Sequence, residues 1–167
     1  MIATLDVTKI PADKMPDRIK TALANPEAAL DRIQKTCDIA LKNLKTLQDA
    51  GVTIAAGTDA GNIGTIHGPA LFREFQLMKT AGLTPMQILQ CATANAARVF
   101  DTTGGTSFRS SGSSPKIGSV APGNFADLVI LNSNPLDDIA HASDIHSVVK
   151  NGVIYSPDSF IHDLAPR

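Results

Sequence analysis

Hydrophobic and polar positions follow two different periods along this chain, and the first is that of a helix. Between Asn25 and Gly51, apolar residues recur every three or four positions, which predicts an amphipathic helix over residues 26–50. Asn25 is a favourable N-cap, Pro26 suits the first helical position and Gly51 suits the far end. The apolar face consists of Leu30, Ile33, Cys37, Ala40, Leu41, Leu44 and Leu47. We therefore expect Cys37 to be a small buried hydrophobic residue.

A short apolar run follows this helix and leads to a carboxylate. Residues 52–56 contain no polar side chain except Thr53, which predicts a strand buried on both faces. A helix followed by such a strand is typical of a parallel α/β sheet, in which ligands gather at the carboxyl ends of the strands. Asp59 lies at that end, between Gly57 and Gly61.

Two further helices are predicted after a glycine-rich loop. The first begins at Pro69, presents an apolar face and ends at Gly82. The second begins with Thr84 and Gln87, which have the spacing of a capping box, and continues to Phe100. Before the long helix, residues 1–24 carry little signal, and we expect a short strand and a loop there.

The second period, that of strands, begins near residue 117. Strands are predicted over residues 117–120, 126–131, 146–150 and 153–156. Asn151 and Gly152 separate the last two strands, which predicts a β-hairpin with a type I′ turn. A stretch of serine, threonine and glycine lies between the two periods, and it is too polar to form a packed core. We expect three segments: residues 1–101, a linker at 102–116, and residues 117–167.

Composition excludes several classes of protein. The chain has 167 residues, of which 43% are hydrophobic, enough for one folded domain with a small addition. Its net charge is −1 and its charged residues are scattered along the chain, so neither a nucleic acid nor a membrane surface is an expected partner. The two cysteines form no metal-binding or disulfide motif. With neither a transmembrane run nor a signal peptide, a soluble, cytoplasmic protein is the default expectation.

Asp59 is the first candidate for chemistry. A carboxylate between glycines at a strand end can ligate a metal or take a proton from a bound water, and it can equally cap a turn. His67, in the glycine-rich loop eight residues later, can contact substrate or metal, or begin the next helix at the surface. From these residues alone, both alternatives stay open for each. The pair Asp137 and Asp138 is expected to make turn and cap hydrogen bonds.

The remaining histidines are His141, His146 and His162, and no role is assigned to them. The chain also lacks a nucleophile elbow, a phosphate-binding loop and a dinucleotide fingerprint. A nucleotide-binding function is therefore not expected.

Several short motifs, taken in order, resemble one family. They are Gly57-Thr58-Asp59-Ala60-Gly61, His67-Gly68, Ala81-Gly82-Leu83-Thr84-Pro85, Ala92-Thr93-Ala94-Asn95-Ala96-Ala97, Gly118-Ser119-Val120-Ala121-Pro122-Gly123, Ala126-Asp127-Leu128-Val129-Ile130 and Asn134-Pro135-Leu136. Each is weak alone, but their sequence order across about residues 51–155 resembles the C-terminal portion of the amidohydrolase superfamily. The resemblance is to its imidazolonepropionase-like and metal-dependent dipeptidase-like branch.

This resemblance implies a fold and an activity. The fold is α/β, the C-terminal part of a TIM-like (β/α)₈ barrel followed by a small β-sandwich segment. The activity is hydrolysis of a C–N bond in a small amide, cyclic amide or dipeptide by water activated on one or two divalent metal ions, with zinc expected. Asp59 matches the aspartate that ligates metal and carries the proton, and His67 is a candidate substrate contact.

The chain also departs from the family pattern. It contains no His-x-His, and the bridging residue and later histidine ligands of the family have no counterparts. A catalytic zinc needs about three protein ligands, and Asp59 is the only one the resemblance places. We therefore expect a C-terminal fragment that is inactive alone and has a missing N-terminal half, or a homo-oligomer, as partner. The alternative is a non-catalytic binding or oligomerisation module derived from the same fold.

Overall fold

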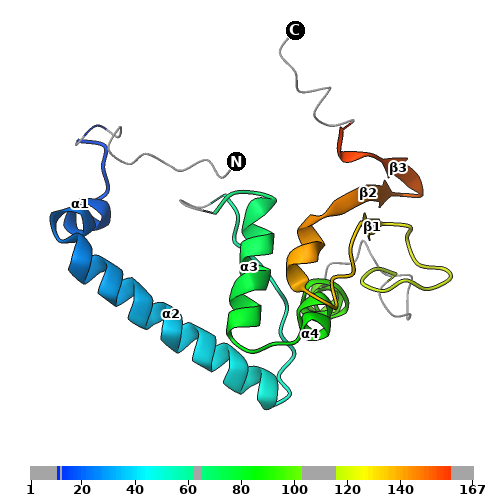
Figure 1. Cartoon of the computed structure of the whole chain (residues 1–167), viewed down its shortest axis with the longest axis horizontal. Coiled ribbons are helices and arrows are strands. Elements are labelled where there is room, and N and C mark those ends of the chain that lie inside the picture. The colour runs from blue at the N-terminus through cyan, green and yellow to red at the C-terminus, as the bar shows by residue number, and fades with distance from the viewer. Residues whose placement is uncertain (1–10, 12, 62–64, 103–115, 159–167) are drawn as a thin grey trace, which may run out of the picture.

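The computed structural model describes residues 11, 13–61, 65–102 and 116–158 as helices followed by one small sheet (Figure 1). The helices are α1 (Asp17–Ala24), α2 (Pro26–Asp49), α3 (Pro69–Thr80), α4 (Pro85–Gln90), the π-helix η2 (Cys91–Asn95), α5 (Ala96–Thr102) and the 3₁₀ helix η4 (Ile139–Ser143). The strands are β1 (Leu128–Leu131), β2 (Ile145–Lys150) and β3 (Val153–Tyr155). The described part of the chain is thus mixed helix and sheet.

Helix α2 begins as the sequence predicts. The side chain of Asn25 accepts a hydrogen bond of 3.2 Å from the backbone N–H of Ala28, and Pro26 is the first helical residue. The preceding helix α1 was not predicted, and the expected loop there is wrong for residues 17–24. Asp17 in its first turn favours the helix dipole, and its backbone carbonyl accepts a hydrogen bond from the Thr21 hydroxyl. None of the described helices is long and apolar enough to cross a membrane.

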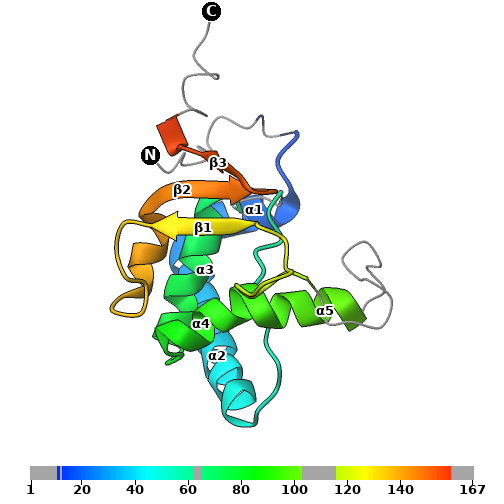
Figure 2. The ribbon, with the colours of Figure 1, turned by 90° about the vertical axis from the view of Figure 1, so that its right-hand side faces the viewer.

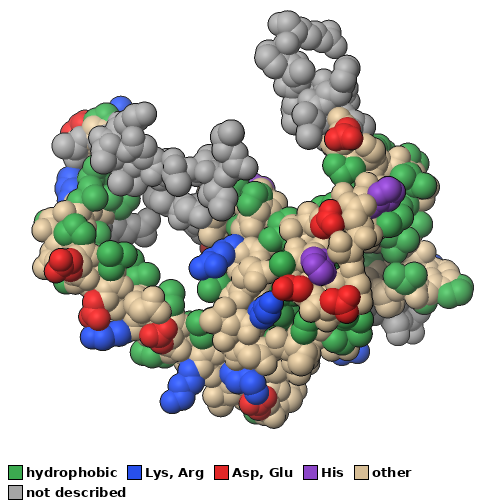
Figure 3. All heavy atoms as spheres, viewed as in Figure 1, with side chains coloured by type: hydrophobic (Ala, Val, Ile, Leu, Met, Phe, Trp, Pro, Cys, Tyr) green, Lys and Arg blue, Asp and Glu red, His purple; other side chains and the backbone are tan. Residues whose placement is uncertain are grey.

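The apolar face of α2 is uncovered, so the expected burial of Cys37 is wrong. No residue of α2 is buried, and Cys37 is exposed. Leu30 and Ile33 are 66% and 56% exposed. Toward the C-terminal end of α2, Leu44 packs against the core. Figure 3 shows hydrophobic side chains lying between charged ones along this projecting helix. The amphipathic pattern predicted the helix correctly. It shows that one face of the helix is apolar, but not that this face is buried.

The segment over residues 52–56 is also more exposed than predicted. It lies in no described strand pair, and Val52 is 47% exposed. Instead it contacts a helix: the backbone N–H of Ala56 donates to the carbonyl of Cys91 at 3.0 Å, and Ile54 packs against the core. A strand buried on both faces needs paired neighbours and two covering layers, which the described residues do not provide.

The core lies between α3, α4, η2 and η4. Its buried members are Phe75, Met78, Leu83, Ile88, Cys91, Ile139 and Ala142. Phe72 and Phe75 meet edge to face with ring centroids 6.2 Å apart. Figure 2 shows the sheet lying beside α3, with α4 and α5 on the side of α3 away from β3. Ile139 and Ala142 come from beyond residue 116, so the first and last predicted segments share one core; their division remains a prediction.

The sheet has the order β1-β2-β3, with both pairs antiparallel. Its turn confirms the sequence-based hairpin prediction, because Asn151 and Gly152 adopt φ values of 50° and 80°. The predicted strand at 117–120 is wrong: those residues form bends rather than a strand. Gly118 explains why, since it crosses the helix in close contact instead of lying beside β1.

At Gly118, two separate parts of the chain come into close contact. A Cβ placed on Gly118 would lie 2.6 Å from the Cβ of Ala97 and 2.8 Å from the carbonyl oxygen of Thr93. The φ of Gly118 is also +83°, a conformation that glycine adopts without steric cost. Both the available space and the backbone conformation therefore require glycine here.

We predict that Gly118→Ala lowers the free energy of unfolding by about 2–4 kcal/mol, because it adds an overpacking cost to the cost of a left-handed alanine. Gly123→Ala is the matched control: Gly123 has a φ of +89° but nothing within 4 Å of an added Cβ. The control should cost about 1–2 kcal/mol, for the backbone alone. Urea titrations of both variants give the comparison, and equal losses would contradict the close contact at Gly118.

Candidate active site

Asp59 lies in an exposed turn just beyond the 52–56 segment. Its φ is 48°, in the left-handed region that few residues other than glycine adopt. The hydroxyl of Thr65 donates a 3.2 Å hydrogen bond to the carbonyl oxygen of Asp59, and the N–H of Gly61 donates to the carbonyl of Thr65 at 3.1 Å. These two bonds close the loop from Asp59 to Thr65 at its base. Thr65 is therefore hydrogen-bonded to the backbone on both sides of Ala60.

His67 lies over the same turn. A Cβ placed on Gly61 would lie 3.8 Å from Nε2 of the His67 imidazole. His67 is exposed and comes just before Gly68, which ends the loop and caps α3. The structure therefore places the His67 imidazole near Gly61, two residues after Asp59.

The residues present do not supply a complete metal site. Among the residues that the structure describes, no group of three or more histidine, cysteine, aspartate or glutamate side chains is placed to hold a metal ion. Asp59 is a suitable oxygen ligand, but a catalytic zinc site requires about three protein ligands. The chain's described residues therefore do not fit a bound metal without further ligands.

Among the described residues, burial raises the pKa of Cys91 and of Glu74. Cys91 is 1% exposed in η2, and burial raises the pKa of its thiol, so it remains protonated and is a poor nucleophile. Glu74 is half-buried on α3, and burial raises the pKa of its carboxyl. Neither residue carries a role in the site around Asp59.

The predicted turn and cap roles of Asp137 and Asp138 are confirmed. Asp138 accepts a 2.9 Å hydrogen bond from the N–H of Ala140 at the start of η4 and pairs with Lys79 of α3 at 3.0 Å. Asp137 accepts a 3.0 Å bond from the side chain of Asn134. The backbone N–H of Ala140, with Lys79 beside it, lowers the pKa of the Asp138 carboxyl. These carboxylates tie the C-terminal segment to α3.

The nearby histidines are likewise engaged in local hydrogen bonds. His141 Nδ1 lies 2.8 Å from the carbonyl oxygen of Asn134, and His146 Nδ1 lies 3.1 Å from the side-chain oxygen of Asn132. Asp144 accepts from Asn132 and from Ser133, and these bonds lower the pKa of its carboxyl. His162 lies outside the described residues. The described histidines of this segment therefore hold loops in place.

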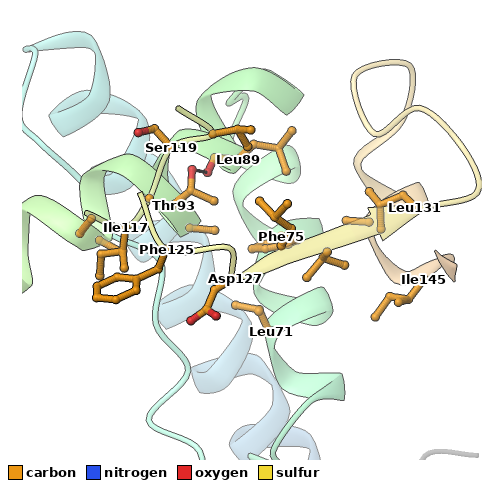
Figure 4. A pocket seen from close by; sticks show the side chains of 18 of the residues that line it. Leu71, Phe75, Leu89, Thr93, Ile117, Ser119, Phe125, Asp127, Leu131 and Ile145 are labelled. Atoms are coloured by element: carbon orange, nitrogen blue, oxygen red, sulfur yellow. Dashed lines mark hydrogen bonds between the residues drawn. The ribbon is translucent and has the colours of Figure 1, made fainter. Parts of the chain in front are cut away.

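An apolar groove of about 850 Å³, which sequence reasoning missed, separates the sheet from the helices. Figure 4 shows Ile117 and Phe125 at one end and Leu131 and Ile145 at the other, with Phe75 between them. Its walls come from α3, the α4–α5 helix, residues 117–129 and the sheet, so no local pattern in the sequence could have found it.

Asp127 is the charged residue among those lining the groove. It accepts a 2.8 Å hydrogen bond from the N–H of Asn151 and pairs with Lys150. The N–H of Asn151, followed by Lys150, lowers the pKa of the Asp127 carboxyl. A carboxylate held in this way fixes the β2–β3 turn against β1, so the groove offers apolar surface rather than reactive groups.

Comparisons with known proteins identify the family. The model of the amidohydrolase family matches residues 39–155, which is more than half of the chain. The chain belongs to the amidohydrolase family. The matched range includes Asp59, His67 and all three strands.

Related proteins agree with this assignment. An ochratoxinase from Aspergillus niger is 32% identical over 108 residues, which are 65% of this chain and 20% of that protein. Its solved structure matches 83% of this chain and 30% of its own, with 29% identity and a TM-score of 0.61. The similarity to amidohydrolase structures implies a TIM-barrel-type fold.

Two further solved structures are similar. A Xaa-Pro dipeptidase with bound methionine in its active site has 28% identity and a TM-score of 0.56, and covers 70% of this chain and 25% of its own. A molinate hydrolase has 26% identity and a TM-score of 0.58, and covers 75% and 28%. This amidohydrolase chain spans about a fifth of the length of the curated relatives that it matches.

We predict that acid destabilises the chain through Asp127, Asp138 and Asp144. Their folded-state pKa values are lowered, so the unfolded chain binds more protons as the pH falls below about 4. Their contribution to stability is complete above that pH and is lost as the pH falls through the folded-state pKa values. Urea titrations between neutral pH and about pH 2 should show this loss. Replacing all three with asparagine should flatten the curve, and an unchanged slope would contradict the prediction.

Proposed function

We propose that this chain is the C-terminal portion of a metal-dependent amidohydrolase that hydrolyses a C–N bond in a small amide, cyclic amide or dipeptide. The observation that carries the proposal is the family match over residues 39–155, which includes Asp59 in an exposed, internally braced turn. The related Xaa-Pro dipeptidase and molinate hydrolase are both named as hydrolases, which supports the reaction class. Within the family, we propose the imidazolonepropionase-like and metal-dependent dipeptidase-like branch.

Asp59 is assigned two roles in this proposal. Its carboxylate is one ligand of a divalent metal, zinc in first place, and it passes a proton from water to the leaving nitrogen. His67, beside the same turn, is assigned a contact to substrate. The other metal ligands come from outside the described residues of this chain, because those residues hold no group able to bind a metal.

Exposed apolar surface supports the view that further protein completes the barrel. Leu30 and Ile33 on α2 and Val52 before Asp59 are all exposed, although their pattern is that of packed residues. In a complete barrel, a strand at 52–56 has paired neighbours and α2 is packed along its length. We therefore propose that residues 1–101 are a partial barrel, that 102–116 link it to the rest, and that 117–167 belong to a small β-sandwich. Alone, the chain is inactive.

The same exposed face supports a second candidate function. A helix with a continuous, uncovered apolar stripe is suited to partner binding or oligomerisation without catalysis. This alternative does not require Asp59 or a metal. The two functions therefore differ in what happens when the missing metal ligands are supplied.

We predict that the purified chain alone binds no stoichiometric metal tightly and shows no hydrolysis of N-acyl amino acids, dipeptides or imidazolones above background, because its ligand set is incomplete. Asp59→Asn should then be indistinguishable from the unmodified chain. Metal content by mass spectrometry and hydrolysis by liquid chromatography provide the measurements. Tight one-to-one metal together with turnover would contradict the fragment proposal. A His-x-His encoded in frame or in a neighbouring reading frame would support it.

We predict that Asp59 becomes essential when the missing elements are present. The test is a chimera in which residues 39–155 replace the corresponding segment of the Aspergillus niger ochratoxinase. In a folded, active chimera, Asp59→Asn should lower kcat by about 10²–10⁴-fold, as expected for loss of acid–base catalysis. His67→Asn should mainly raise KM. Asp49→Asn, which removes an exposed helix carboxylate, is the control. Full activity of the Asp59 variant would support the non-catalytic alternative.

A further inference from the structure

We propose that Asn95, on the π-helix η2, is the positioning residue that holds Asp59 in place. The inference rests on the proposed role of Asp59 and extends it to a residue far away in the sequence. Asn95 does not touch the site itself. It acts through the backbone of the segment that leads to Asp59.

Two hydrogen bonds join that segment to η2. The side-chain amide of Asn95 donates to the carbonyl oxygen of Ile54 at 3.0 Å, and the N–H of Ala56 donates to the carbonyl oxygen of Cys91 at 3.0 Å. In a sheet, neighbouring strands would provide such bonds. Here residues of the helix stand in for one neighbour, and Asp59 follows Ala56 by only three positions.

The π-helix accounts for the direction of the Asn95 side chain. A π-turn contains one residue more than an α-turn, so it rotates every later side chain by about 100° relative to a regular α-helix. Asn95 is the last residue of η2, and the chain returns to an α-helix at Ala96. Single π-turns inside α-helices are frequent at functional sites. In this helix the π-turn orients the residue that reaches the 52–56 segment.

The helix has buried residues, whereas the 52–56 segment has none. Ile88, Cys91 and Ala97 are 0%, 1% and 4% exposed, and Gly118 packs against the helix beside Ala97. In the 52–56 segment, Ile54 and Ala56 are partly buried and the other residues are exposed. A half-buried amide that joins the two can therefore position the less buried segment relative to the buried helix.

The hydrogen bond to Ile54 also offsets the cost of burying the Asn95 side-chain amide. A half-buried side-chain amide in a helix has a desolvation cost unless it is hydrogen-bonded. Its donors face the Ile54 carbonyl and lie 4.0 Å from the Cys91 sulfur. Leucine or alanine would pack in this helix at lower cost. Asparagine provides the one property they lack, a donor aimed at the segment before Asp59.

The test uses the full chain, isotope-labelled, by nuclear magnetic resonance, and it needs neither metal nor substrate. Asn95→Asp keeps the shape of the side chain. It replaces the amide NH₂ group, which donates to the Ile54 carbonyl, with an oxygen that repels that carbonyl. We expect hydrogen exchange at the Ala56 amide to rise about five- to tenfold, the effect of one lost hydrogen bond. The amide signals of Asp59 and Gly61 should also shift.

The matched control is Asn124→Asp. Asn124 donates its side-chain amide to the carbonyl of Ser119 at 2.9 Å, the same kind of bond in a loop of the C-terminal segment. The control should leave the signals of Ala56, Asp59 and Gly61 unchanged. A merely structural role of Asn95 would lower the urea midpoint without moving the Asp59 and Gly61 signals in the folded chain. That result would overturn the proposal, as would unchanged exchange at Ala56.

If Asn95→Asp does not fold, the unmodified chain decides the question. Backbone order parameters of about 0.85 from Ala56 to Asp59, as expected for a rigid helix, support the positioning role of Asn95. Values below about 0.6 overturn it. These outcomes do not depend on hydrolysis. Failure of the proposed enzyme function would appear in the chimera with Asp59→Asn, and failure of the positioning role would appear here.

Discussion

The structure depends on the packing of one helix, Pro85–Thr102, against three separate parts of the chain. Its buried face contributes Ile88 and Cys91 to the core, where Phe75 of α3 and Ile139 of η4 also lie. The same helix receives Gly118 in a contact too close for any Cβ. Its π-turn holds the 52–56 segment through Cys91 and Asn95. The helix therefore connects the Asp59 turn to the C-terminal sheet, although these are far apart in sequence.

This arrangement leaves a clear boundary between packed and unpacked surface. Interiors of folded domains are densely packed, and large exposed apolar stripes mark surfaces that meet something else. Ile88, Cys91 and Ala97 of the Pro85–Thr102 helix are buried, whereas no residue of α2 is buried and Val52 is 47% exposed. Exposed apolar side chains lie on α2 and at Val52, and also at Val120 and Ile154 in the C-terminal segment.

Features set by neighbouring residues were predictable from the sequence. Asn25 caps α2, Thr84 and Gln87 form the capping box of α4, and the Asn151-Gly152 turn joins β2 to β3. Each depends on side chains and backbone within four positions, so its signal lies in a short stretch of sequence. The family, too, could be inferred from the order of short motifs. The left-handed conformation of Asp59 could not, since its loop is closed by Thr65.

Features set by distant residues escaped prediction for a physical reason. An amphipathic stripe shows that a face can be buried, but whether it is buried depends on what lies opposite, so Cys37 was wrongly expected in the core. A π-turn has no strong propensity signal, and the bond from Asn95 to Ile54 spans 41 positions.

The same distinction bears on the candidate site. Asp59 is recognisable by its neighbours, whereas a metal site requires ligands that only a fold brings together. The role proposed for Asp59 therefore depends on further ligands that the described residues of this chain do not supply.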